Sequence, residues 1–110
     1  MSTTRLDLPQ GTLDLLVLRV LSAGEMHGWG IAQRLSIVSN DALQLQEGTL
    51  YPALYRMEAK GWIESEWAAS ENNRRAKYYR LTKVGRKQLE AQKQSWDRLT
   101  AVVAQVIQKA

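Results

Sequence analysis

The clearest pattern in the chain is an amphipathic helix predicted over residues 49–59. Four apolar residues recur at the helical spacing i, i+3, i+4 and i+7: Leu50, Ala53, Leu54 and Met57. Pro52 fits only within the first turn of a helix, so this helix is expected to begin near Gly48 or Thr49. The opposite side is lightly polar and partly aromatic, and consists of Thr49, Pro52, Tyr55 and Arg56, with Tyr51 at its border. Such a side suits insertion into a DNA groove, but an ordinary amphipathic helix explains the pattern equally well.

Two strands are predicted directly after this helix. Residues 63–67 alternate at the period of a strand, residues 70–75 have the composition of a turn, and residues 77–81 alternate again. Tyr79 and Leu81 fall on one face of the second strand. A short helix followed by two strands around a basic tip predicts the wing of a winged helix-turn-helix.

Two further helices are predicted in the first forty residues. The first covers residues 13–21, with Thr12 as its N-cap. Its apolar residues occupy two sides of the helix: Leu13, Leu16, Val17, Val20 and Leu21 on one, and Leu15 and Leu18 on the other. A turn at residues 27–30 leads to the second helix, expected from Ile31 to about Ser39. Its inner residues are Ile31, Leu35 and Val38. A linker follows, in which Leu43 and Leu45 alternate as in a short strand.

A long last helix is predicted from Lys83 to about Gln108, with Thr82 as its N-cap. Six positions alternate three- and four-residue steps, as in a heptad repeat: Leu89, Gln92, Trp96, Leu99, Val103 and Val106. A helix of about 26 residues extends roughly 39 Å, which is longer than so small a domain covers. Part of this seam is therefore expected to pack on a second copy. The predicted dimer-interface residues are Leu89, Trp96, Leu99, Val103 and Val106. Packing of the whole helix on its own domain is the alternative.

Composition narrows the class of protein. Hydrophobic residues make up 45% of the chain, which excludes wholesale disorder. No apolar run reaches 18 residues, so no membrane association is expected. The chain has no cysteine, so it lacks disulfides and thiolate metal sites, and a reducing cytoplasm is the expected location. The single histidine, His27, has no second histidine to share a metal, so no metal site is expected.

Positive charge is concentrated in one stretch of the chain. The net charge is +4, which favours a polyanionic partner only mildly. Between residues 74 and 87, however, seven cations occur without an acid: Arg74, Arg75, Lys77, Arg80, Lys83, Arg86 and Lys87. A solvated face usually mixes both signs, so this run favours contact with nucleic acid over simple solvation.

Four linked motifs, at residues 28–31, 47–54, 74–79 and 81–85, resemble the PadR family of bacterial transcriptional regulators in order and spacing. The resemblance implies a mainly α fold with a small β wing and no cofactor. It implies a winged-helix domain over residues 9–82 and a dimerisation helix over residues 83–108. The implied function is that of a homodimeric repressor, which binds double-stranded DNA with its third helix in the major groove.

Positions carried over from the family give candidate DNA contacts. The resemblance assigns Thr49, Tyr51 and Arg56 to the reading face, together with Pro52 and Tyr55 on the same helix, and Arg74, Arg75 and Lys77 to the wing. Trp29 stands where the family pattern usually has tyrosine. If that tyrosine contacts a phosphate through its hydroxyl, two possibilities stay open: the indole N–H of Trp29 makes the contact instead, or the contact is lost.

In multidrug-responsive members of the family, a tryptophan of the last helix stacks on flat aromatic drugs at the dimer interface. Trp96 resembles that residue, and Leu15, Lys93 and Thr100 are its predicted neighbours in a site for a planar aromatic effector. No acid follows Trp96 by one turn, which counts against cationic drugs. Ordinary packing of an aromatic side chain is the alternative explanation of Trp96.

The chain carries no arrangement of residues typical of an enzyme. Serine and acidic residues occur without a histidine base in any motif frame, and no glycine-rich phosphate loop follows a strand. A DNA-binding repressor released by a small molecule is therefore the expected function. A ligand-binding dimeric module without DNA activity and a protein-interaction adaptor are the alternatives, because a fold alone does not determine a function.

Overall fold

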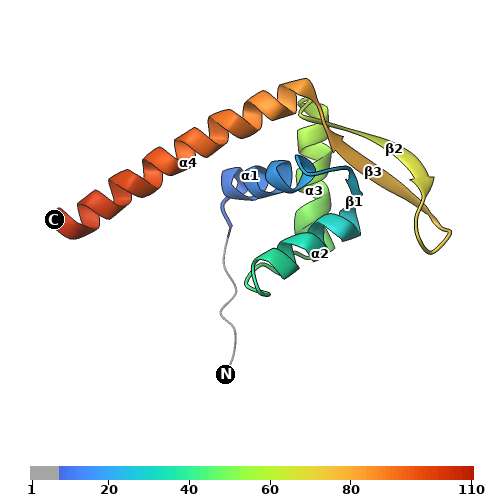
Figure 1. The fold of residues 1–110 in the computed structure, drawn as a ribbon, viewed down its shortest axis with the longest axis horizontal. Coiled ribbons are helices and arrows are strands. Elements are labelled where there is room, and N and C mark those ends of the chain that lie inside the picture. The colour runs from blue at the N-terminus through green and yellow to red at the C-terminus, as the bar shows by residue number, and fades with distance from the viewer. Residues whose placement is uncertain (1–7) are drawn as a thin grey trace.

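The computed structural model describes residues 8–110, which form four helices and a small antiparallel sheet (Figure 1). In chain order these are α1 (Gln10–Leu21), β1 (Met26–His27), α2 (Gly28–Val38), α3 (Glu47–Ala59), β2 (Ile63–Ala69), β3 (Arg75–Leu81) and α4 (Lys83–Lys109). The strands pair in the order β1-β3-β2. The predicted fold class, a mainly α winged helix with a long C-terminal helix, is confirmed.

The core lies between the first three helices and the inner face of the sheet. All four residues of the predicted α3 stripe are buried: Leu50, Ala53, Leu54 and Met57. The prediction that α1 packs on two sides is also confirmed, because Val17 and Leu18 are both 0% exposed. The spacing of apolar residues was sufficient for both results, since it reports which sides of a helix meet other elements.

Helices α1 and α2 both begin three residues earlier than predicted. The carbonyl of Pro9 accepts the N–H of Leu13 at 3.0 Å, so α1 begins at Gln10 and Thr12 is not its N-cap. Nδ1 of His27 accepts the N–H of Gly30 at 2.9 Å, so α2 begins at Gly28 rather than Ile31. At the other end of α2, Val38 is 64% exposed, and its predicted inward position was wrong.

The small third strand also differs from the prediction. The linker at residues 40–46 contains no strand, and β1 instead pairs with β3 through Met26 and His27. This strand has only two residues, which is too short for an alternation to appear in the sequence. It ties the start of α2 to the wing.

Helix α3 begins one or two residues earlier than Pro52 led us to expect. It begins at Glu47, so Pro52 occupies the sixth position. The only backbone bond lost is the one to the carbonyl of Gly48, which is exposed and therefore open to water. As predicted, Gly61 terminates the helix: it follows the Lys60 cap with φ +77°. The N–H of Trp62 closes the end by donating to Met57 at 3.1 Å.

The wing has the predicted alternation. Strands β2 and β3 pair antiparallel, with Ser65 opposite Tyr79 and Trp67 opposite Lys77. Asn73 lies at the tip with φ +59°, a conformation that asparagine tolerates better than most residues. The hairpin projects away from the helices (Figure 1).

The start of α4 is fixed to the winged helix. As predicted, Thr82 caps the helix, because its Oγ1 accepts the N–H of Gly85 at 3.0 Å. A Cβ on Gly85 would lie 1.9 Å from the carbonyl oxygen of Trp62, so only glycine permits this approach. Leu89 is 5% exposed and belongs to the core, so its assignment to a dimer interface was wrong. The first two turns of α4 therefore pack as part of the winged helix.

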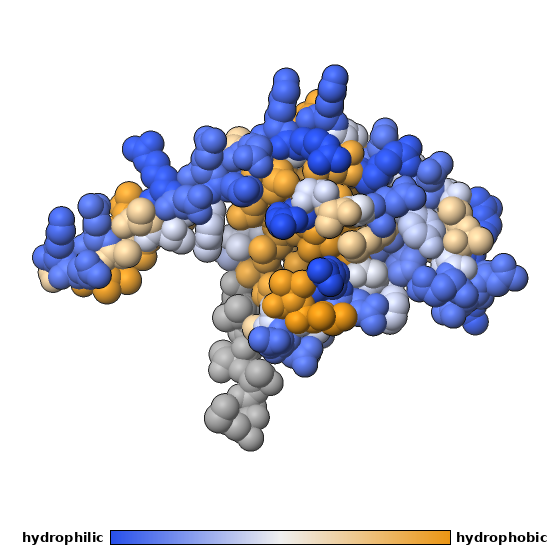
Figure 2. Space-filling model, in the orientation of Figure 1, coloured by the Kyte–Doolittle hydropathy of each residue, from blue (hydrophilic) through white to orange (hydrophobic). Residues whose placement is uncertain are grey.

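The rest of α4 is open. Every residue from Lys93 to Ala110 is exposed. Figure 2 shows hydrophobic side chains gathered on the lower side of this helix toward its C-terminus. The large hydrophobic side chains exposed on this part of α4 are Trp96, Leu99, Val102, Val103, Val106 and Ile107. Such a stripe has no cover within the described part of the chain. Within residues 8–110, no helix is both long enough and apolar enough to cross a membrane.

Candidate nucleic-acid interface

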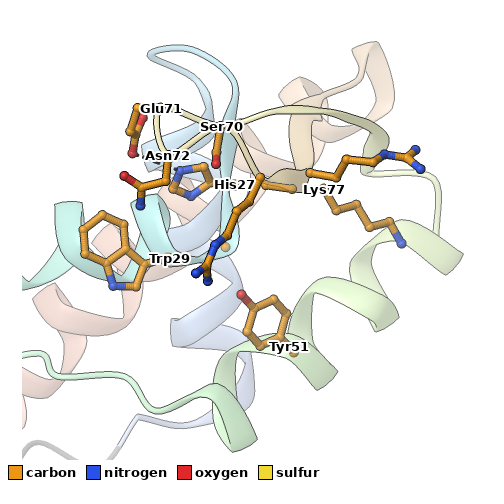
Figure 3. A pocket seen from close by; sticks show the side chains of 11 residues that line it. His27, Trp29, Tyr51, Ser70, Glu71, Asn72 and Lys77 are labelled. Atoms are coloured by element: carbon orange, nitrogen blue, oxygen red, sulfur yellow. Dashed lines mark ion pairs between the residues drawn. The ribbon is translucent and has the colours of Figure 1, made fainter.

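A groove of about 370 Å³ opens where α2, α3 and the wing meet. In Figure 3, Trp29 and Tyr51 lie along one side of this groove, and Ser70, Glu71 and Asn72 of the wing loop lie along the other. The remaining lining residues are His27, Gly28, Arg74, Arg75, Ala76 and Lys77. The structure thus brings together five of the predicted DNA-binding residues: Trp29, Tyr51, Arg74, Arg75 and Lys77.

Gly28 determines where the Tyr51 ring lies. A Cβ at Gly28 would be 2.6 Å from the hydroxyl oxygen of Tyr51, which is closer than van der Waals contact permits. The missing side chain lets the phenol rest against the first turn of α2. Because Tyr51 is still 40% exposed, its ring remains available to a ligand in the groove.

His27 connects α2 to the wing. Its Nδ1 caps α2 through Gly30, and its Nε2 lies 3.6 Å from a carboxylate oxygen of Glu71. Its ring centroid is 5.3 Å from that of Tyr78 and 6.1 Å from that of Trp29. The imidazole therefore lies between the two sides of the groove, in contact with the start of α2 and close to the wing loop.

The cations of the wing fall into two groups. Lys77 lies 3.4 Å from Glu58, and Arg80 is paired with Glu64 at 2.9 Å and with Glu66 at 2.8 Å. Among the residues that the structure describes, neither Arg74 nor Arg75 forms an ion pair. The guanidinium carbon of Arg75 lies 5.5 Å from the centre of the Trp67 ring. Within the wing, the unneutralised charge therefore lies at the tip, and the cations Lys83, Arg86 and Lys87 of the same run, also unpaired among the described residues, belong to α4.

Lys77 lies in a partly shielded position beside α3. Its ammonium is 5.7 Å from the centre of the Tyr79 ring as well as 3.4 Å from Glu58. Burial raises the pKa of the Tyr79 phenol, and the charge of Glu58 raises it further. Lys77 would have to leave Glu58 to reach a phosphate directly.

The exposed side of α3 continues beyond the groove. Thr49, Pro52 and Tyr55 are exposed there, and Tyr55 reaches 77% exposure. Arg56 does not share this side. Its Nη2 donates to a carboxylate oxygen of buried Asp14 on α1, so the structure does not support its predicted place on the reading face.

A second groove of about 370 Å³ lies between α1 and α4. Its lining residues are Pro9, Gly11, Thr12, Leu15, Gln92, Ser95, Trp96 and Leu99. The predicted pair of Leu15 and Trp96 meets here. Lys93 and Thr100, also predicted for this site, do not line the groove. Lys93 lies 3.7 Å from Glu90, and the hydroxyl of Thr100 bonds to carbonyls of its own helix.

Sequence reasoning missed several lining residues of both grooves. In the first groove these are Ser70, Glu71 and Asn72, which the sequence analysis treated only as a turn. In the second, Gln92 and Ser95 could have been found, because they precede Trp96 and Leu99 by one helical turn. No comparable spacing leads to the wing loop, because its position depends on the pairing of β1 with β3.

Comparison with known proteins identifies the family. The sequence profile of the Transcriptional regulator PadR-like family matches residues 17–91, which is most of the chain. The chain belongs to this family. The transcriptional regulator Rv3488 of Mycobacterium tuberculosis is 30% identical over 97 residues, covering 88% of this chain and 87% of that protein.

Solved structures of PadR-like regulators have the same fold. A transcriptional regulator from Clostridium thermocellum superposes with a TM-score of 0.80 at 29% identity, covering 87% of this chain and 93% of that one. A PadR family transcription regulator from Clostridium difficile gives 0.74 at 36% identity, with 86% and 97% covered. The long C-terminal helix and the wing are thus features of a PadR-family winged-helix regulator.

Proposed function

We propose that this PadR-family regulator binds double-stranded DNA sequence-specifically as a homodimer in the cytoplasm, and that it represses transcription until a planar aromatic effector releases it. The observation that carries the proposal is the first groove. There the starts of α2 and α3 meet the cationic tip of the wing, beside the exposed side of α3.

Two physical properties of the groove favour DNA. The N-termini of helices carry partial positive charge and unpaired N–H groups, which attract phosphate. Arg74 and Arg75 add full charges that no acid of the described residues neutralises. These groups would hold the backbone, while Thr49, Tyr51 and Tyr55 on α3 would face the base edges.

The open end of α4 supports a homodimer. The predicted interface residues Trp96, Leu99, Val103 and Val106 are between 42% and 57% exposed in the single chain. A hydrophobic stripe at heptad spacing is the usual surface for pairing two helices. Two-fold symmetry would then present two copies of α3 to half-sites about 34 Å apart.

The second groove supports an effector. It is lined mainly by apolar groups, and it lies beside the part of α4 that a second copy would cover. A flat compound stacked on Trp96 would release DNA only if it preferred a dimer with a different spacing of the α3 helices. A ligand-binding module without DNA activity is the second candidate, and this groove is the observation that favours it.

DNA binding is tested by measuring affinity for the chain's own upstream DNA and for random DNA over a range of salt concentrations. Arg74→Ala and Arg75→Ala should lower the affinity for both DNAs by the same factor. They should also lower the slope of log affinity against log salt concentration by about one per lost phosphate contact. Thr49→Ala and Tyr55→Ala should narrow the gap between the two DNAs by about 1–3 kcal/mol per base contact. Arg98→Ala, which removes a cation from α4, is the matched control. Equal binding of upstream and random DNA by the wild type would overturn sequence-specific DNA binding and favour the ligand-binding module.

A further inference from the structure

One buried ion pair joins α1 to α3. Asp14 is 3% exposed and is the one charged residue in the buried part of the described chain. Its carboxylate accepts a hydrogen bond from Nη2 of Arg56, whose side chain is 27% exposed. The two residues come from helices that share one apolar core, so the pair lies within the packing between these helices.

Stability alone explains this pair poorly. Burial raises the pKa of the Asp14 carboxyl, although the nearby charges of Arg56 and Lys60 act to lower it. Nε of Arg56 is buried and has no hydrogen-bond partner among the described residues. Replacing a buried ion pair with apolar side chains is often neutral or stabilising, because desolvation offsets the attraction between the charges. The pair therefore requires another explanation.

Most other contacts of α3 are not directional; the exception is Glu58 near its C-terminal end, which accepts a hydrogen bond from Ser65 at 2.6 Å and lies 3.4 Å from Lys77. Leu50, Ala53, Leu54 and Met57 pack into the common core. Apolar contacts of this kind depend on the area buried and only weakly on orientation, so they tolerate small rotations of the helix. A charged hydrogen bond loses strength quickly when its distance or angle changes. The Asp14–Arg56 pair is consequently the directional contact that favours one rotational setting of α3 against α1.

We propose that Asp14 and Arg56 are positioning residues for the DNA-reading side of α3, and that Arg56 does not itself contact DNA. This inference rests on the proposed function, in which α3 reads the bases. Arg56 lies one turn beyond Pro52 and next to Tyr55 on the same helix, so a rotation released at Arg56 would move every exposed side chain of the reading side.

The test is a double-mutant cycle on DNA affinity with Asp14→Asn, Arg56→Gln and the double variant. Each single change should lower affinity for the upstream DNA about tenfold, and the double variant should lose no more than either one. Affinity for random DNA should stay within about twofold of wild type, and the salt slope should be unchanged. The two substitutions shift the net charge in opposite directions, so a shared loss cannot come from overall electrostatics. Arg19→Gln, at an exposed site on α1, is the matched control.

The contrary outcomes are distinct. If Arg56→Gln lowers the salt slope by about one while Asp14→Asn binds as wild type, Arg56 contacts a phosphate and the inference is wrong. If both single variants bind as wild type, the pair does not position α3. Failure of the wild type to prefer upstream DNA would overturn the proposed function and this inference together.

A further variant covers the case in which a single charge left buried prevents folding. The double replacement Asp14→Leu with Arg56→Met is expected to fold, because both charges are removed together. It should show the same tenfold loss for upstream DNA, since apolar side chains do not restore the directional contact. Affinity equal to wild type in this folded variant would overturn the inference.

Discussion

The two grooves of this regulator have the same volume, about 370 Å³ each, and opposite linings. The groove beside the wing contains Arg74, Arg75 and Lys77 with the polar wing loop. The groove between α1 and α4 contains Leu15, Trp96 and other largely apolar groups. Size therefore says nothing about which ligand each groove suits, whereas charge and hydration favour phosphate in the first and a flat hydrophobic compound in the second.

The grooves also differ in how much of each a single chain completes. Around the first, the positions of Tyr51 and the wing loop are set by contacts within the chain, through Gly28 and His27. Beside the second, α4 continues with every residue from Lys93 exposed. The first groove is therefore complete within one chain, while the second gains its full enclosure only if a second copy covers α4.

The largest expected effect comes from a substitution that prevents a second copy from packing on α4. Val103→Asp would bury an unpaired charge in the α4 seam, which costs several kcal/mol, so the variant should sediment as a monomer and lose DNA affinity. Gln105→Asp places the same charge on the opposite side of the helix and should leave both properties unchanged. A wild-type protein that sediments as a monomer at micromolar concentration would contradict the predicted dimer.

The next effect concerns the first groove alone. Gly28→Ala would push the Tyr51 ring away from α2, and it should weaken binding to upstream DNA by about 1–3 kcal/mol if Tyr51 contacts a base. The Tm should change little, because the displaced ring can swing into the groove. Gly11→Ala is the control, since its Cβ would have nothing within 4 Å and lies in the other groove. Equal DNA affinity in both variants would remove Tyr51 from the reading side.

A smaller effect concerns the second groove alone. Trp96→Ala should weaken binding of a flat aromatic dye by about tenfold, because stacking on an aromatic ring contributes roughly 0.5–1.5 kcal/mol beyond the buried area. Dye binding is measured through the dye's own fluorescence, because Trp29, Trp62 and Trp67 also emit. Trp29→Ala is the control in the other groove and should leave dye affinity unchanged. Identical dye affinity in the Trp96 variant would assign Trp96 to packing.

The smallest effect is a pH dependence that neither groove causes. Because burial raises the pKa of Asp14, the folded chain binds more protons than the unfolded chain from pH 3.8 up to that raised pKa. The contribution of Asp14 to the free energy of unfolding is therefore greatest at low pH and falls as pH rises through this window. In urea unfolding at fixed protein concentration, the free energy of unfolding of the wild type should rise relative to that of Asp14→Asn as pH falls. If this difference instead rises as pH rises, the attraction of the Asp14 carboxylate to Arg56 outweighs the desolvation that burial causes. Asp97→Asn controls for loss of an exposed acid.

Much of the fold was readable from local patterns. Three correctly predicted features depend on residues that are close together in sequence. They are the apolar stripe of α3, the alternation of the wing strands and the Thr82 cap. The strand pairing at Met26 and the cap at His27 were not readable in this way. The strand pairing depends on Tyr79, about fifty residues away in sequence. The cap depends on a histidine, whose role changes with its surroundings.

The candidate site was predicted in part. Trp29, Tyr51 and the cations of the wing were identified through family motifs, and the structure brings them into one groove. Arg56 was placed with them because a helical projection shows only which side a residue occupies. Such a projection cannot show that Asp14, from another helix, lies opposite that residue. The wing-loop residues of the groove were missed for the same reason.

The sequence by itself determined the succession of the four helices and the two wing strands, the buried side of α3 and the heptad pattern of α4, because periodicity acts between near neighbours in the chain. The tertiary structure alone decided that Leu89 belongs to the core while Trp96 stays exposed, although both occupy the same heptad stripe. It also decided that Arg56 pairs with Asp14 while Arg74 remains unpaired among the described residues. These outcomes depend on which distant side chains meet, and a one-dimensional pattern carries no record of such contacts.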